Sequence, residues 1–122
     1  MRGEGGLGGD CKATRIREKY VEQRLIQAVR QCGGLALKFV SPGFNGVPDR
    51  LLLFMGGKVA FVEVKAPGES PRPLQAHRME QLRRMGFKVY VLDSAEDIDN
   101  LVSDVAEGAR GRSESPRRKE AL

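Results

Sequence analysis

The sequence predicts a single α/β domain in which a mixed β-sheet is flanked by helices. A chain of 122 residues has room for one modest hydrophobic core. Its middle changes between helical and strand periodicity in the order αβββαβα. A strand, a helix of about a dozen residues and another strand form the unit that produces a parallel pair. Because the earlier strands are joined by short loops, the sheet would contain both parallel and antiparallel pairs.

The periodic part of the chain covers residues 14–106, which we interpret as the folded domain. Residues 1–13 are rich in glycine, and residues 107–122 are rich in Arg, Ser and Glu. Such segments lose much conformational entropy on ordering and bury little apolar surface in return. We therefore expect a flexible leader before the domain and a flexible basic tail after it.

The first half of the domain contains one helix and three strands. Apolar residues recur at helical spacing over residues 15–32, after Thr14 and before Gly33 and Gly34: Val21, Leu25, Ala28, Val29 and Cys32. Residues 35–40 form a short apolar run, and the turn-forming residues 41–46 follow it. Residues 49–54 and 58–65 read as two strands joined by a glycine-containing hairpin, so this pair would be antiparallel.

The second half of the domain contains two helices and one strand. Pro73 suits the first turn of a helix that runs to about Met85 and ends at Gly86. Residues 88–92 read as a fourth strand. Ser94 then begins a capped last helix that continues through Val105.

The composition favours a cytoplasmic protein and limits its partners. The longest unbroken apolar run, residues 51–55, is far shorter than the roughly 20 residues of a membrane span. No signal-peptide pattern begins the chain. Cys11 and Cys32 match neither a zinc motif nor a disulfide framework. The net charge of +5 favours a polyanionic partner, although much of the excess lies in the tail.

The most informative residues lie at the ends of the central hairpin. Val59, Phe61, Glu63 and Lys65 share one face of their strand, so a carboxylate and an ammonium group end an otherwise apolar face. Asp49 begins the partner strand and can approach Glu63. Two converging carboxylates repel unless a cation lies between them, and oxygen ligands suit Mg²⁺ or Mn²⁺. Lys65 could then hold a nucleophile and offset charge on a phosphate.

Two features decide between this metal site and an ordinary surface ion pair. An isolated E-x-K triplet is more often an exposed ion pair. Asp49, directly after Pro48, favours the metal site instead, because it brings a second carboxylate within reach of Glu63. Hairpin geometry gives a test. A two-residue turn would pair Asp49 with Val64, whereas a three-residue loop or a bulge would pair Asp49 with Glu63 on one face. We therefore expect either an odd-length loop with a glycine at positive φ or a bulge in one of the strands.

The ordered motifs resemble the VRR-NUC (virus-type replication-repair nuclease) branch of the PD-(D/E)xK nucleases. They are Glu22, Gly46-Val47-Pro48-Asp49, Glu63-Val64-Lys65, Gln75 and Gly86-Phe87-Lys88-Val89. The resemblance covers about residues 20–101. It implies a restriction-endonuclease-like fold with Mg²⁺ or Mn²⁺ and no organic cofactor. It also implies a role for each site residue. Asp49, Glu63 and the Val64 carbonyl would bind the metal ion, and Lys65 would act on the attacking water. Glu22 and Gln75 would belong to the same site.

The resemblance implies an endodeoxyribonuclease for branched DNA, similar to Holliday junction resolvases and acting as a homodimer. One alternative is a nuclease for flaps, nicked duplexes or RNA. Another is a non-catalytic nucleic-acid-binding module, which would be indicated by replacement of Asp49, Glu63 or Lys65; all three are present. His77 is expected to face solvent. With few aromatics and no tryptophan, no platform for single strands is expected. Several cations could contact phosphates: Lys38, Arg50, Arg72, Arg78, Arg83 and Arg84.

Overall fold

The computed structural model describes residues 2–107, with side chains over residues 13–107. The elements are α1 (Arg2–Gln31), β1 (Leu35–Lys38), β2 (Arg50–Phe54), β3 (Lys58–Val64), α2 (Pro73–Arg84), β4 (Lys88–Leu92), the 3-10 turn η1 (Ala95–Asp97) and α3 (Ile98–Ala106). The order αβββαβα predicted from the sequence is confirmed. Most of the predicted basic tail lies outside the described residues. No helix within residues 2–107 has the length and apolar character needed to cross a membrane.

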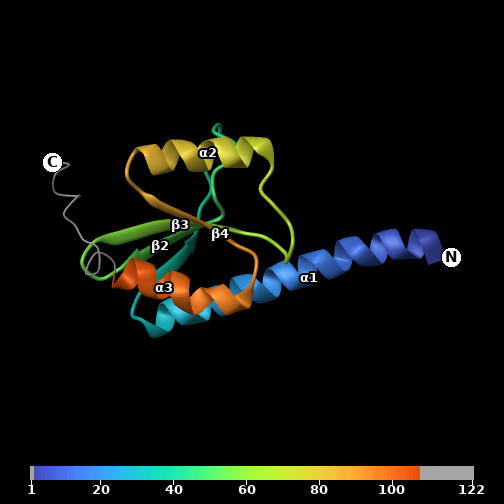
Figure 1. The fold of residues 1–122 in the computed structure, drawn as a ribbon, viewed down its shortest axis with the longest axis horizontal. Coiled ribbons are helices and arrows are strands. Elements are labelled where there is room, and N and C mark those ends of the chain that lie inside the picture. The colour runs from blue at the N-terminus through green and yellow to red at the C-terminus, as the bar shows by residue number, and fades with distance from the viewer. Residues whose placement is uncertain (1, 108–122) are drawn as a thin grey trace.

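The four strands form one mixed sheet in the order β1-β2-β3-β4 (Figure 1). β2 pairs antiparallel with both β1 and β3, and β4 pairs parallel with β3. The predicted parallel pair around α2 is therefore confirmed. β3 has a neighbour on each side, and its last five residues are all buried. The strand that carries Glu63 is thus central, as its apolar composition indicated.

Helices cover both faces of the sheet, with α2 on one face and α1 and α3 on the other (Figure 1). The larger core cluster lies on the α1 and α3 face: Val21, Leu25, Val29, Leu52, Phe54, Ala60, Val62, Val64, Leu92, Ile98, Leu101, Val102 and Val105. The smaller cluster, Phe61, Met79 and Val89, lies under α2. Alternate residues of β3 supply the two clusters, which is the expected alternation of a strand covered on both faces. Glu63, two residues after Phe61, therefore belongs to the α2 face.

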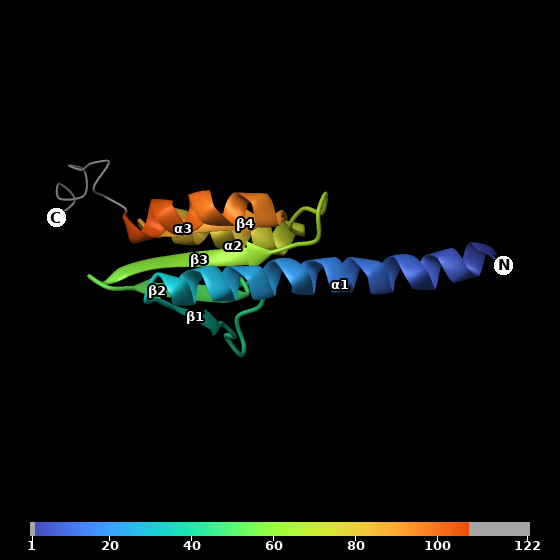
Figure 2. The same ribbon diagram turned by 90° about the horizontal axis from the view of Figure 1, so that it is seen from below.

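Helix α1 begins earlier than the sequence indicated. Its predicted start at Thr14 was wrong, because α1 extends from Arg2 to Gln31. Residues 10–14 contain neither proline nor glycine, so the helix extends through them at little cost, because adding a residue costs far less than nucleating a helix. Nothing in the structure explains its continuation through the five glycines of residues 3–9. The first part of α1 projects beyond the end of the sheet (Figure 2). The flexibility of residues 1–13 stays a prediction.

The hairpin between β2 and β3 has a three-residue loop, as the shared carboxylate site required. Phe54 pairs with Lys58 and Arg50 pairs with Val62, so the same register sets Asp49 opposite Glu63. Gly56 and Gly57 within the loop have φ values of 87° and 74°. This region of φ is open to glycine and strained for most other residues. Both parts of the hairpin prediction, the odd loop and the positive φ, are confirmed.

The turn after α1 depends on a close approach between Gly34 and β2. A Cβ atom at Gly34 would lie 2.6 Å from the Leu53 carbonyl oxygen and 2.9 Å from Phe54 Cδ1. We predict that Gly34→Ala lowers the free energy of unfolding by about 2 kcal/mol, because backbone must shift to relieve the contact. Thermal denaturation measures this, with Gln31→Ala, at an exposed position, as the control. A Gly34→Ala chain as stable as the control would contradict the packing.

Candidate active site

The carboxylates predicted at the hairpin lie together at one end of the sheet. Asp49 immediately precedes β2, and Glu63 and Val64 end β3, with Lys65 next in the chain. The Val64 backbone N–H donates a hydrogen bond to Asp49 Oδ2 at 3.2 Å. The Asp49 carbonyl in turn accepts from the Phe39 amide at 2.7 Å. Asp49 is thus held between the end of β3 and the loop that leaves β1.

Glu63 is the only charged residue of the described side chains to be buried, with 2% of its surface exposed. Its Oε2 accepts a hydrogen bond from Gln75 Nε2 at 2.9 Å and lies 3.4 Å from Lys65 Nζ. Its Oε1 has no hydrogen-bond partner among residues 13–107. A buried carboxylate oxygen without a partner costs free energy, and native proteins rarely keep one without a use for it.

Gln75 connects the start of α2 to the end of β3. It is the third residue of α2, and its Oε1 accepts a hydrogen bond from the Arg72 backbone N–H at 2.9 Å, as in a capping box. The same side-chain amide donates its Nε2 hydrogen to Glu63. Because one planar amide makes both bonds, the helix start orients the carboxylate. The sequence predicted that Gln75 lies at this site, and the structure brings it there.

Glu22 reaches the site through Arg50 and makes no direct bond to Asp49 or Glu63. Its Oε2 accepts hydrogen bonds from Arg50 Nη2 at 2.6 Å and Arg50 Nε at 3.0 Å. Arg50 follows Asp49 in the chain and also donates to the Ala36 carbonyl oxygen at 3.4 Å. The Glu22 charge nevertheless acts on Asp49, whose pKa it helps to raise.

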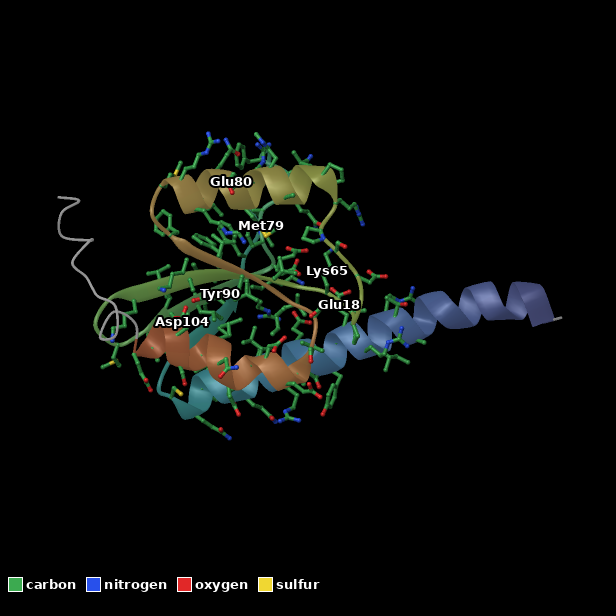
Figure 3. The ribbon with its side chains drawn as sticks, in the orientation of Figure 1. Glu18, Lys65, Met79, Glu80, Tyr90 and Asp104 are labelled. Atoms are coloured by element: carbon green, nitrogen blue, oxygen red, sulfur yellow. The ribbon has the colours of Figure 1, made fainter. Side chains whose placement is uncertain are left out.

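Glu18 is a further carboxylate at this site that the sequence analysis did not single out. Burial, followed by the charge of Asp49, raises the pKa of its carboxyl group above the ordinary value. It lies beside Lys65 at the end of β3 (Figure 3), and Lys65 partly offsets the shift. The spacing of Glu18 could have identified it from the sequence: it lies one helical turn before Glu22, so both occupy the same side of α1. They also line one open hollow of about 490 Å³ beside the helix.

The comparisons with known proteins identify the family. The model of the VRR-NUC domain family matches residues 10–96. The chain belongs to the VRR-NUC family. A protein of Acyrthosiphon pisum secondary endosymbiont phage 1 named "Putative nuclease p44" is 49% identical over 90 residues, or 74% of this chain and 96% of that protein. A solved structure named "VRR_NUC domain" is 31% identical, with a TM-score of 0.68 over 71% of this chain and 95% of that chain.

Membership of this family makes the chain a nuclease, and therefore a hydrolase whose substrate is nucleic acid. The structural match also confirms the predicted fold, a small mixed sheet with flanking helices. Aligned coverage of 95–96% of the two relatives means that the likeness extends over their whole domain and not over a fragment of it.

The electrostatics of this VRR-NUC site fit a divalent cation. Burial, followed by the Asp49 charge, raises the pKa of Glu63, and burial also raises the pKa of Asp49. Among the described residues no group of three or more His, Cys, Asp or Glu side chains is arranged to hold a metal ion. Asp49 and Glu63 supply two neighbouring carboxylates, and Mg²⁺ is commonly held by one or two carboxylates together with waters.

We predict that Glu63→Gln does not destabilise the metal-free chain and raises its melting temperature by about 4 °C, the shift expected for about 1 kcal/mol in a domain of this size. The substitution removes a buried charge and its repulsion with Asp49, while the amide oxygen can still accept from Gln75. Thermal unfolding in a chelator tests this. As the control, Glu96→Gln removes an exposed carboxylate at the start of η1 and should change nothing. A clear loss of stability in Glu63→Gln alone would show that the carboxylate stabilises the fold.

Proposed function

We propose that this VRR-NUC domain is a metal-dependent endonuclease that hydrolyses phosphodiester bonds in branched DNA, in the manner of a Holliday junction resolvase. One observation carries the catalytic part. The Glu63 carboxylate is buried beside Asp49 with one oxygen left without a partner among residues 13–107, and Lys65 lies 3.4 Å from the other oxygen. Such an arrangement is costly for stability alone and suits a cation and a phosphate.

Asp49, Glu63 and the Val64 carbonyl are the groups that would hold Mg²⁺ or Mn²⁺. A divalent cation bound there supplies positive charge against the scissile phosphate and favours ionisation of a nucleophilic water. The protein's own contribution is orientation. The Val64 N–H positions the Asp49 carboxylate, and Gln75 positions the Glu63 carboxylate. Both carboxylates are thereby set before any ligand arrives, which reduces the cost of binding.

Lys65 is the group we assign to the reacting water and the phosphate. Its ammonium lies beside Glu63, and only 12% of its side chain is exposed. It can orient the attacking water and offset negative charge as it develops on the phosphate oxygens. The water oxygen forms a bond to phosphorus while a P–O ester bond breaks, and the departing oxygen takes up a proton. One product end then carries the phosphate and the other a hydroxyl group.

The α1 carboxylates complete the proposed site. Glu22 holds Arg50, and Arg50 in turn lies next to Asp49 in the chain. Glu18 adds a second charge from α1 within range of Asp49 and Lys65. Glu22 is paired with Arg50, whereas burial and then the charge of Asp49 raise the pKa of both Glu18 and Glu63. A cation at this end of the sheet would offset that repulsion.

Branched DNA and a homodimer are supported by the resemblance and by the surface of β1. β1 is an edge strand, and it and the residues just after it expose large apolar side chains: Leu35, Leu37 and Val40. Exposed apolar edges are common sites of association between protein chains. A two-fold dimer could place two active sites on the two continuous strands of a four-way junction. Flaps, nicked duplexes and RNA are the alternative substrates.

Cleavage of labelled junctions, flaps and duplexes with Mg²⁺, Mn²⁺ or chelator tests this function. We predict that Asp49→Asn and Glu63→Gln each lower the junction cleavage rate by at least about 100-fold, because each loses a group that holds the cation. Asp99→Asn, an exposed carboxylate on α3, is the control and should cut like the wild type.

The same panel separates the alternatives. Either variant cutting junctions at the wild-type rate in Mg²⁺ would place the site elsewhere. Faster cutting of flaps or RNA than of junctions would replace the proposed substrate. Tight DNA binding without cleavage under any metal would favour the non-catalytic module.

We predict that the chain is a homodimer at micromolar concentration, as measured by light scattering. Leu37→Lys should shift it towards the monomer, because a charge on the exposed edge of β1 opposes association there. Met85→Lys, at an apolar position after α2 that is more exposed (71% against 40% for Leu37), is the control. A wild-type chain that is monomeric and still cleaves junctions would refute the proposed dimer.

A further inference from the structure

One exposed aromatic side chain stands on the loop that leads into the active site. Phe44 lies five residues before Asp49, and 46% of its surface is exposed. The low aromatic content of the sequence led us to expect no stacking platform. In the folded chain, however, a single exposed aromatic ring lies on the loop before Asp49, and one well-placed ring is enough to stack on a base.

The loop that carries Phe44 has a defined conformation. Ser41, Pro42, Gly43 and Phe44 form a turn in which the Phe44 amide donates to the Ser41 carbonyl at 3.1 Å. Gly43 has a φ of 81°, and proline followed by glycine at positive φ is the pattern of a type II turn. Phe44 is therefore exposed by a turn that the local sequence favours.

The loop is also fixed to helix α2. Arg78 Nε donates to the Asn45 carbonyl at 2.7 Å. Gly46 approaches α2 so closely that a Cβ atom there would lie 2.8 Å from Leu74 Cγ. These contacts hold the exposed ring in place, so little conformational entropy would be lost when a ligand binds it.

The Phe44 ring is stacked on a cation. The guanidinium carbon of Arg78 lies 3.7 Å from the ring centroid, which is a close cation–π contact. Arg78 covers one face of the ring, and the exposed fraction of Phe44 leaves ring surface for another planar group. Phe87 is exposed to a similar extent, but its ring packs edge-on against Phe61 in the core.

The platform is close to the proposed chemistry. Arg78 lies three residues after Gln75, slightly less than one helical turn, so the two are separated by about 4.5 Å along the axis of α2. Gln75 bonds Glu63, and Arg72 at the start of the same helix is exposed. We infer that a nucleic acid strand with its phosphate next to Lys65 could extend along the start of α2 and bring a base to Phe44.

We propose that Phe44, supported by Arg78, stacks on an unpaired nucleobase next to the branch point of the DNA substrate. This inference rests on the proposed function and names the feature of the substrate that the site would recognise. A base in continuous duplex has both faces covered by its neighbours, whereas a base at a branch can expose one face to an aromatic ring. The platform would thereby favour branched over continuous DNA.

A coupling experiment tests the stacking directly. DNA affinity is measured by fluorescence anisotropy in chelator, for a branched DNA with a base next to the branch and for the same DNA with an abasic site there. We expect Phe44→Leu to weaken binding to the first DNA about tenfold and to leave binding to the second unchanged. Phe44→Tyr, which keeps an aromatic face, should behave like the wild type.

Two controls make the result specific. Phe87→Leu changes a similarly exposed phenylalanine that follows α2 and should have no effect on either DNA. Equal melting temperatures of wild type and Phe44→Leu show that the loop still packs. Equal losses by Phe44→Leu on branched, abasic and continuous DNA would overturn the inference, since Phe44 would then only shape the loop.

The outcomes also separate this inference from the proposed function. A wild type that cleaves branched DNA while Phe44 shows no coupling would overturn the stacking alone. A wild type that cleaves only continuous duplex would refute the proposed substrate. Coupling of Phe44 to a base in single-stranded DNA would support the stacking even then.

Discussion

The burial of the Glu63 carboxylate at the end of the central strand is the constraint on which the site depends. Moving a charged group out of water costs on the order of several kcal/mol, and one of its oxygens has no partner among the described residues. Lys65 and Gln75 offset part of that cost, whereas Asp49 adds to it. The fold therefore accepts local instability at the place where a cation would remove it, a pattern often found at functional sites.

The β2–β3 loop determines whether the two carboxylates can meet at all. Side chains of a strand alternate between faces, so one residue more or less in the loop would move Asp49 to the opposite face from Glu63. The loop from Met55 to Gly57 has the required length, and its two glycines accept the positive φ values that it needs. A short turn far from the site thus sets the geometry of the site.

Helix α2 joins two parts of the molecule that are distant in sequence. Gln75 in its first turn contacts the end of β3, and Arg78 one turn later contacts the loop before β2. Contacts with the same rigid helix therefore position both the proposed catalytic groups and the exposed ring of Phe44. Elements of regular structure hold such groups more accurately than loops do.

The sequence by itself determined the element order and the hairpin, because these follow from local periodicity and turn-forming residues. It made the approach of Asp49 to Glu63 conditional on an odd loop or a bulge, and the three-residue loop of the folded chain met that condition. It did not determine that α1 begins at Arg2, or that Glu18 shares the site while Glu22 holds Arg50. Nor did it place Phe44 on Arg78. The placements of Glu18, Glu22 and Phe44 depend on how each helix is rotated and set against the sheet, and only the packing of the whole core fixes that arrangement.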